Sequence, residues 1–292
     1  GKNGNIYELY ITKGGSWKFA NLSQIAGGAS EAVGGISGYD SKTFNSKQVA
    51  YVGKNGNIYE LYITKGGSWK YADLSQLVGG APAAVSGISG YDSQVFNSKQ
   101  VAYIGKNGNI YELYTTKDGN WKYANLSQLV GGAPAAVGGI TGYDSQVFNS
   151  KQVAYVGTDG NIYELYITKD GNWKYANLSQ LVGGAPAAVG RIIGYDSQVF
   201  NSKQVAYVGK DGNIYELYTT KDGNWKYANL SQIAGGAPRA VSVISSYDSK
   251  TFNSKQVAYV GTDGNIYELY ITKGGNWKYA NLSQITSESL RN

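Results

Sequence analysis

Apolar and polar residues alternate along short runs of the chain, and the same runs recur from one end to the other. The run "GNIYELYIT" first occurs at residues 4–12, and the run "KQVAYVG" first occurs at residues 47–53. Both are rich in Tyr and β-branched residues, and a period of two is typical of half-buried β-strands. No stretch shows an amphipathic pattern of helical length, so we expect an all-β protein.

The residues between these runs are typical of tight turns. "KNG", "KDG" or "TDG" separates "KQVAYVG" from "NIYELYIT", and "KGGS" or "KDGN" separates "NIYELYIT" from "WKYANLSQ". Asn-Gly and Asp-Gly pairs favour hairpin turns because both residues tolerate positive φ. A fourth run, "AVGGISGYD", follows "GGAPA" and returns through a polar loop such as "SQVFNS". Each repeat therefore predicts four antiparallel strands, with the Gly-rich run as the inner strand.

The repeats account for the whole chain. Near-copies of one sequence begin at Val52, Ile104, Val156, Val208 and Val260, which are 52 residues apart. A copy that lacks its first residue begins at Gly1. Four strands per repeat of this length predict a β-propeller, whereas a solenoid generally uses shorter elements and needs capping ends. We expect a single propeller domain over 1–292, with a partial copy at 1–32 and full copies at 33–84, 85–136, 137–188, 189–240 and 241–292.

The two ends of the chain are unequal. The third and fourth strands occur six times but the first two occur five times, which gives 22 strands where six four-stranded blades would have 24. We favour six blades with an incomplete N-terminal blade, in which Ile6, Leu9 and Trp17 are buried. A partner, an upstream segment or nothing completes this blade. Five blades with an extra hairpin, or "NIYELY" as the inner strand, are the alternatives. Because exposed edges recruit other chains, we expect a homodimer or a swapped assembly through this blade, or a distorted closure that "ITSESLRN" partly covers.

Missing residue types exclude most catalytic chemistry. The chain has no Cys and no His, so it lacks thiolates, zinc–thiolate sites and imidazole for metal binding or acid–base catalysis near neutral pH. We expect no cofactor, no metal and no enzymatic activity. The apolar runs are too short to span a membrane, and the first residues show no signal-peptide pattern.

The charge of the chain is modest and evenly distributed. The formal net charge of +6 includes one lysine per copy, at Lys47, Lys99, Lys151, Lys203 and Lys255. We expect these lysines to lie around a solvated surface, because a nucleic-acid interface would need basic residues clustered on one face. Nucleic acid is therefore not an expected partner.

Each copy also carries the residue types that bind neutral sugars. Glu112 lies between the tyrosines of "NIYELY", beside Ile110 and Leu113, which we expect to be buried, and Trp121 follows nine residues later. Carboxylates accept hydrogen bonds from sugar hydroxyls, amides donate and accept them, and an indole face covers the apolar side of a pyranose. The structural alternative is that Trp and Tyr pack between blades while Glu pairs with a nearby Lys.

The order of these motifs resembles a known family. A small-apolar strand, Val-x-Tyr, an Asp/Asn-Gly turn, Ile-x-Glu and Trp resemble the fucose-binding propeller lectins of the Aleuria aurantia type and the Photorhabdus-type bacterial propeller lectins. The resemblance implies pockets built from an Arg, a Glu twelve residues later and a Trp of the next blade. Here Gln stands at the Arg position. Gln lacks the charged donor fork of Arg, so fucose affinity is expected to be weaker or specificity to differ.

The resemblance implies one pocket per blade junction, five of them complete. The implied carbohydrate-binding residues are Gln48, Glu60 and Trp121; Gln100, Glu112 and Trp173; Gln152, Glu164 and Trp225; Gln204, Glu216 and Trp277; and Gln256, Glu268 and Trp17. Glu8 has no Gln partner, which predicts a defective sixth pocket.

We therefore expect a lectin with several weak sites for neutral glycans, in which multivalency supplies avidity. The alternative is a structural or protein-interaction scaffold, engineered or recently amplified, with vacant pockets. A glycosidase would need two carboxylates across one sugar. Asp40, Asp92, Asp144, Asp196 and Asp248 supply a second acid per copy, but "GYDS" is more typical of a turn.

Overall fold

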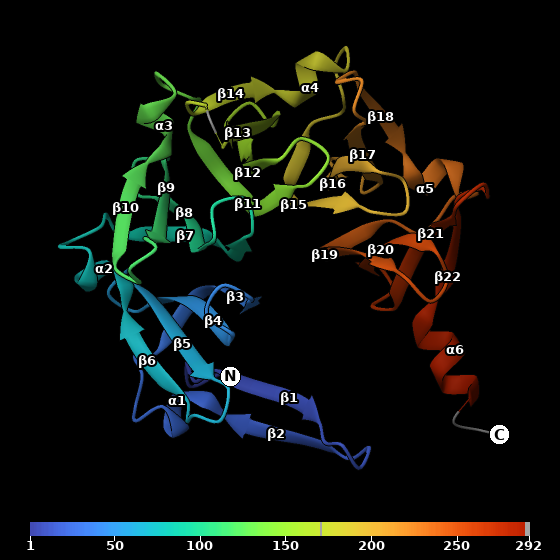
Figure 1. Ribbon diagram of the computed structural model, residues 1–292. Coiled ribbons are helices and arrows are strands. Elements are labelled where there is room, and N and C mark those ends of the chain that lie inside the picture. The colour runs from blue at the N-terminus through green and yellow to red at the C-terminus, as the bar shows by residue number, and fades with distance from the viewer. Residues whose placement is uncertain (170, 290–292) are drawn as a thin grey trace. The chain divides into compact units, whose positions relative to one another are not determined.

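The computed structural model describes residues 1–169 and 171–289 and is dominated by β-strands (Figure 1). Within these residues, 22 strands form six antiparallel sheets. The first sheet contains β1 (Tyr7–Ile11) and β2 (Trp17–Asn21). The other five have four strands each, in chain order β3 (Ala32–Ser41), β4 (Ser46–Gly53), β5 (Ile58–Thr64), β6 (Lys70–Asp73); β7 (Ala84–Ser93), β8 (Ser98–Gly105), β9 (Ile110–Thr115), β10 (Trp121–Asn125); β11 (Ala136–Ser145), β12 (Ser150–Gly157), β13 (Ile162–Thr168), β14 (Lys174–Asn177); β15 (Ala188–Ser197), β16 (Ser202–Gly209), β17 (Ile214–Thr219), β18 (Trp225–Asn229); β19 (Ala240–Ser249), β20 (Ser254–Gly261), β21 (Ile266–Thr272), β22 (Lys278–Asn281).

Each four-stranded sheet is a meander in which neighbours in sequence pair antiparallel. This confirms the four strands predicted for each repeat. In the sheet β11–β14, Ala154 of β12 lies opposite Glu164 of β13. Residues directly opposite each other share a face of the sheet, so Glu164 lies on one face while the next residue, Leu165, lies on the other.

The turns between the second and third strands differ in one detail from the expectation. Gly56 has φ 81°, while Asn55 is not among the described residues with positive φ. The Asn55 side chain instead accepts a hydrogen bond from the backbone of Asn57 at 3.0 Å. Positive φ was therefore wrong for this Asn, because a side-chain hydrogen bond stabilises the turn and leaves only Gly in the left-handed region.

The end of the fourth strand is also shorter than predicted. Strand structure was expected through "NLSQ", but the strands end at Asn or Asp and the following residues form helices: α1 (Leu22–Ile25), α2 (Leu74–Leu77), α3 (Leu126–Leu129), α4 (Leu178–Leu181), α5 (Leu230–Ile233) and α6 (Leu282–Ser289). Asn177 caps α4 by accepting from the backbone N–H of Gln180, and Ser179 Oγ accepts from the N–H of Ile162 at 2.9 Å. These side-chain hydrogen bonds favour a helical turn over a longer strand.

The apolar core lies between consecutive sheets. Tyr143, Ala154 and Ile162 of one sheet pack with Val205 and Leu217 of the next. Burial of Ile110 and Leu113 is confirmed, since both are fully buried. Within each of the two compact units, the face of a sheet that carries Glu therefore packs against the opposite face of the sheet that follows it.

Two compact units divide the chain at Ala133 and Pro134. The first holds β1–β10 and the second holds β11–β22. The expected single domain, the closure of a ring and the role of the C-terminal "ITSESLRN" stay predictions, and residues 290–292 of that segment lie outside the described part. In the residues that the structure covers, no helix is long and apolar enough to cross a membrane.

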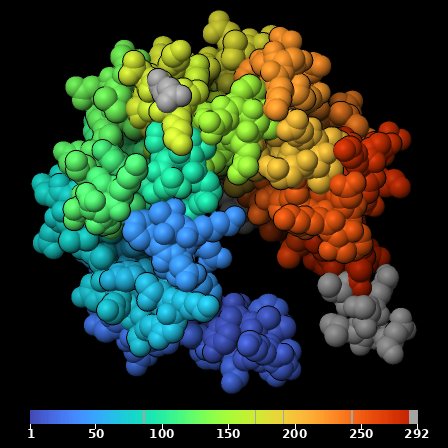
Figure 2. Space-filling view, in the orientation of Figure 1, coloured from blue at the N-terminus to red at the C-terminus, as the bar shows by residue number. Residues whose placement is uncertain are grey.

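The N-terminal hairpin packs against the first four-stranded sheet, next to which Figure 2 shows it in dark blue. Ile6 is buried beside Leu22, Tyr51 and Leu61. Leu9 and Trp17 are 75% and 72% exposed, however. The predicted burial of all three apolar residues therefore holds for Ile6 alone.

Candidate functional site

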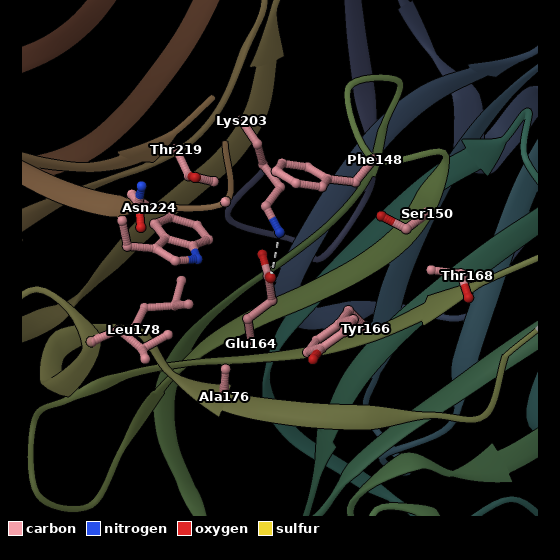
Figure 3. A pocket seen from close by; sticks show the side chains of 13 residues that line it. Phe148, Ser150, Glu164, Tyr166, Thr168, Ala176, Leu178, Lys203, Thr219 and Asn224 are labelled. Atoms are coloured by element: carbon pink, nitrogen blue, oxygen red, sulfur yellow. Dashed lines mark hydrogen bonds and ion pairs between the residues drawn. The ribbon is translucent and has the colours of Figure 1, made fainter. Parts of the chain in front are cut away.

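A buried glutamate is the centre of a polar cluster between the sheets β11–β14 and β15–β18. Glu164 is 2% exposed. Its Oε1 accepts a hydrogen bond from the Tyr143 hydroxyl at 2.7 Å, and its Oε2 pairs with Lys203 Nζ at 2.6 Å, the contact drawn as a dashed line in Figure 3. Both carboxylate oxygens therefore have a partner, one from each sheet.

The tyrosine of this cluster is fixed as a hydrogen-bond donor. Burial raises the pKa of Tyr143 well above its usual value, and the nearby Glu164 carboxylate raises it further. A phenolate beside a carboxylate in an apolar environment would be doubly unfavourable. Tyr143 therefore keeps its proton across the physiological pH range and holds one oxygen of Glu164 in place.

Aromatic rings surround the lysine of the cluster. The Lys203 ammonium lies 5.0 Å from the ring centroid of Trp225, 5.1 Å from that of Phe148 and 6.0 Å from that of Tyr166. Trp225 belongs to the sheet of Lys203, while the other two rings come from the preceding sheet. Cation–π contacts and the ion pair together compensate for the loss of water around a buried ammonium.

A pocket of about 480 Å³ opens beside this cluster. The preceding sheet contributes Phe148, Ser150, Glu164, Tyr166 and Thr168, and the following sheet contributes Lys203, Thr219, Asn224 and Trp225. Figure 3 shows the labelled side chains, among them Phe148, Glu164, Lys203 and Asn224, around the space between the two sheets. The size of the pocket suits a small ligand. Its lining combines aromatic faces with several polar groups, as the lining of ligand-binding pockets usually does.

The same cluster occurs at two further junctions within the units. Between β3–β6 and β7–β10, Lys99 pairs with Glu60 at 2.6 Å and lies 4.9 Å from the Trp121 ring. Between β15–β18 and β19–β22, Lys255 pairs with Glu216 at 2.7 Å and lies 5.0 Å from the Trp277 ring. The cluster is thus a property of the repeat.

The predicted residues are only partly brought together. Glu164 and Trp225 line one pocket, but Gln152 does not. Gln152 lies opposite Tyr166 on the same face of the sheet, is fully buried and donates its amide N–H to Ser150. The other glutamines of the set, Gln48, Gln100, Gln204 and Gln256, make the same contact with the serine two residues earlier. A direct role of these glutamines in sugar binding stays a prediction.

Two of the predicted pockets combine residues of the first unit with residues of the second unit. In the first unit Glu112 accepts from the Tyr91 hydroxyl at 2.7 Å, and in the second Lys151 lies 4.9 Å from the Trp173 ring. Glu268 accepts from the Tyr247 hydroxyl. The pairing of Gln100 and Glu112 with Trp173, and of Gln256 and Glu268 with Trp17, stays a prediction.

The expected solvated position of the lysines is wrong for four of the five. Lys99, Lys151, Lys203 and Lys255 are at most 8% exposed, whereas the Lys47 side chain is 49% exposed. Alternation along the strand places Lys on the face opposite the adjacent Gln. For Lys99, Lys203 and Lys255, the preceding sheet supplies Glu on that face.

The structural alternative, in which Glu pairs with a nearby Lys, is therefore confirmed for Glu60, Glu164 and Glu216. The constant separation of 39 residues between Glu and Lys was the sequence signal that could have identified the lysine of each pair.

The aspartate of "GYDS" in β15, Asp196, joins its sheet to the loop of the preceding sheet. Asp196 accepts from the backbone N–H groups of Gln146 at 2.5 Å and Val147 at 3.2 Å, which belong to the loop of the preceding sheet. Burial raises the pKa of Asp196, opposed by these hydrogen bonds. Among the described residues, no group of three or more His, Cys, Asp or Glu could hold a metal ion.

Solved lectin structures share this fold. The chain aligns over 95% of its length with 77% of the BP39L lectin of Burkholderia pseudomallei, at TM-score 0.70 and 15% identity. It aligns over 95% with 88% of a variant of Aleuria aurantia lectin in complex with Fucα1-6GlcNAc, at TM-score 0.61 and 17% identity. It aligns over 96% with 87% of AofleA from Arthrobotrys oligospora, at TM-score 0.62 and 14% identity. Neither a protein-family model nor a curated protein matches the sequence.

This similarity, together with the repeated four-stranded meanders, confirms the predicted all-β propeller fold. Six sheets are present in the described residues, and the N-terminal sheet has two strands. The observed sheets therefore agree with six blades of which the first is incomplete.

Proposed function

We propose that the chain is a carbohydrate-binding lectin whose sites lie between consecutive sheets. The observation that carries this proposal is the pocket beside Glu164, Lys203 and Trp225, whose ionic and aromatic cluster recurs at two other junctions. Several equivalent weak sites on one chain provide avidity for surfaces that display many copies of a glycan.

The pocket residues suit a neutral sugar. Trp225 offers an aromatic face to the C–H groups of a pyranose. Lys203 has three N–H donors, and Glu164 accounts for one of them. Thr219 Oγ1 and the exposed Asn224 amide add further polar groups at the pocket wall. In this proposal Glu164 orients Lys203, while Lys203, Thr219 and Asn224 bind sugar hydroxyls.

Fucosides are the first ligands to test, because one of the similar structures is a complex with a fucose-containing disaccharide. At such low identity the ligand does not transfer with the fold, and this chain has Gln where the resembling family has Arg. Replacing Gln by Arg at 48, 100, 152, 204 and 256 should strengthen fucose binding if the buried glutamines border the pocket. Unchanged fucose affinity of the folded variant would show that these glutamines do not border the sugar-binding site.

The partner proposals follow from the same contacts. Nucleic acid is not a proposed partner, because Lys99, Lys203 and Lys255 are buried in ion pairs and do not present a basic surface. A homodimer through the N-terminal hairpin is supported by the exposure of Leu9, Trp17 and Phe19, each at least 70%. Sedimentation velocity over a range of protein concentrations tests this association.

A glycan array of neutral sugars, followed by calorimetric titration of the strongest hits, tests the lectin proposal. We expect weak binding with more than one equivalent per chain. A folded protein that binds nothing on a broad array would contradict the proposal and leave the scaffold alternative.

A further inference from the structure

The three junctions that carry the Glu, Lys and Trp cluster differ at one polar position. The pocket between β11–β14 and β15–β18 is lined by 13 residues. The repeat of 52 residues gives the equivalent of each one at the other two junctions. At the junction of β3–β6 with β7–β10, every equivalent residue is of the same type.

The junction of β15–β18 with β19–β22 differs at two of these positions. Ile233 stands in place of Leu181, and Ile271 stands in place of Thr219. Leu181 and Ile233 are isomeric side chains and are 57% and 55% exposed. The replacement of Thr219 by Ile271 is therefore the one change of polarity among the lining positions.

Thr219 lies at the base of its pocket. It is opposite Lys203 on the neighbouring strand, so the two side chains share a face of the sheet, and Figure 3 shows them next to each other. Thr219 is 1% exposed, and its hydroxyl donates to the carbonyl of Thr220 at 3.2 Å. A hydroxyl has one donor and two acceptor positions, so Thr219 Oγ1 can still accept a hydrogen bond from a ligand.

The equivalent threonine of the first unit also keeps hydrogen-bonding capacity. Thr115 is 3% exposed, and its Oγ1 accepts from the backbone N–H of Lys99 at 3.0 Å, which leaves its proton for a ligand. Ile271 lies opposite Lys255 but has no polar side-chain atom. Two junctions therefore offer a hydroxyl where the third offers only carbon.

The same position also goes with a difference in strand pairing. In the two sheets with threonine, the third strand pairs with the Trp that begins the fourth strand, Thr115 with Trp121 and Thr219 with Trp225. The other three four-stranded sheets have isoleucine there, at Ile63, Ile167 and Ile271. In these sheets the third strand stays paired with the second up to the following threonine, and the Trp precedes the fourth strand.

The contact between lysine and tryptophan does not depend on this difference. Lys203 lies 5.0 Å from the Trp225 ring beside threonine, and Lys255 lies 5.0 Å from the Trp277 ring beside isoleucine. The shared cluster is thus constant, while the wall next to it is polar at two junctions and apolar at the third.

We propose that the residue opposite the buried lysine divides the pockets into two classes with different sugar preferences, an inference that rests on the lectin function proposed above. The threonine pockets, at Lys99 and Lys203, bind a sugar that places a hydroxyl against this residue. The isoleucine pocket, at Lys255, binds a deoxy sugar that has a hydrogen or a methyl group there.

Desolvation is the physical reason for the two preferences. A sugar hydroxyl against Ile271 would lose water without gaining a partner, and a deoxy sugar would leave Thr219 Oγ1 without a ligand donor. The net contribution of one neutral hydrogen bond corresponds to about a three- to ten-fold difference in affinity.

Calorimetric titration of the full chain with matched sugars tests the proposal. The probes are the methyl glycosides of D-glucose, D-galactose, D-mannose and L-galactose, the methyl fucoside, which is the 6-deoxy form of the last, and the monodeoxy analogues of the parent sugar that binds most tightly. Ile271→Thr alters no side-chain hydrogen bond of the native chain and should gain one equivalent of parent binding. Thr219→Ile should lose one equivalent of parent binding and gain one of a deoxy analogue.

A double variant separates the hydroxyl from the shape of the side chain. Thr115→Val with Thr219→Val keeps the shape and should lower the ratio of parent to deoxy affinity about three- to ten-fold. Thr115→Ser with Thr219→Ser retains both hydroxyls and should keep the native ratio. Leu77→Ile with Leu181→Ile is the control for the apolar position and should also keep it.

The outcomes distinguish this inference from the lectin proposal. Sugar binding by the native chain with the same preference in the valine double variant and in Ile271→Thr, both folded by circular dichroism, would overturn the two classes and leave the lectin function standing. Binding of none of the probes by the folded native chain would overturn both.

Discussion

Two junctions of the same repeat differ in how much of their polar cluster is buried. At the junction of β11–β14 with β15–β18, the side chains of Glu164 and Lys203 are 2% and 7% exposed. At the junction of the N-terminal hairpin with β3–β6, the side chains of Glu8 and Lys47 are 19% and 49% exposed. The two junctions use the same acid, base and spacing.

The strands that are present explain the difference. The hairpin has the third and fourth strands, and these bury Ile6 and Leu22. It lacks the first two strands, which elsewhere supply Tyr143 to Glu164 and a phenylalanine ring to Lys203. The comparison teaches that the third strand of the preceding sheet is enough to supply the Glu of the ion pair, whereas the first two strands of that sheet exclude water from it.

The largest expected difference between the junctions is the loss in the free energy of unfolding when the lysine is replaced. Lys203→Met keeps an apolar chain among the rings but leaves Glu164 buried without its cation, and should lower the free energy of unfolding by about 3–5 kcal/mol. Lys47→Met at the exposed pair should change it by less than about 1 kcal/mol. Urea denaturation of both variants measures the two values. Equal losses would show that burial does not distinguish the junctions.

A smaller difference is expected at the glycines beneath the tyrosine rings. Gly90→Ala places a methyl group against the Tyr39 ring, and overpacking of this kind should cost about 1–3 kcal/mol. Gly38→Ala meets no such ring and should be neutral or stabilise the chain by up to about 1 kcal/mol. Thermal and urea denaturation compare the variants. A similar loss at Gly38 would mean that its surroundings are already filled.

The smallest effect is a pH dependence that the hairpin junction lacks. Burial raises the pKa of Tyr247 to about 12, and it raises the pKa of Tyr143 well above its usual value. A tyrosine in the unfolded chain loses its proton near pH 10. The stability that each folded tyrosine contributes is therefore complete below about pH 10 and is lost as the pH rises towards the folded pKa.

The variant Tyr143→Phe isolates this contribution. Between about pH 10 and 11, the native chain should lose up to about 1.4 kcal/mol more stability per pH unit than the variant. Unfolding free energies measured in urea at several alkaline pH values give the slopes. Parallel slopes for the two proteins would contradict a protonated Tyr143 in the folded state.

Much of the fold was predictable because every repeat has the same alternation of apolar and polar residues. Alternation identified "NIYELY" and "KQVAYV" as strands, and the fixed period predicted identical sheets. The ends of the fourth strands were mispredicted because the side chain of Asn177 caps a helical turn, a local contact that alternation does not report.

The site was predictable in part from the resemblance to propeller lectins. That resemblance implied a pocket that joins Glu164 with Trp225, one period plus nine residues later, and the two residues line one pocket. Lys203 was missed because a lysine in a polar loop-flanking position is usually solvated. Its burial depends on the face of the neighbouring sheet, and therefore on tertiary packing.

The central claim is that the space between consecutive sheets binds a sugar against Trp225. Calorimetric titration of the best neutral monosaccharide into the native chain and into Trp225→Ala tests it most directly, with Tyr227→Ala as a control on an exposed aromatic residue of the same strand outside this pocket. We predict that Trp225→Ala loses one equivalent of binding while the remaining sites keep their affinity, and that its circular dichroism is native. An unchanged number of equivalents in the folded Trp225→Ala protein would contradict the claim.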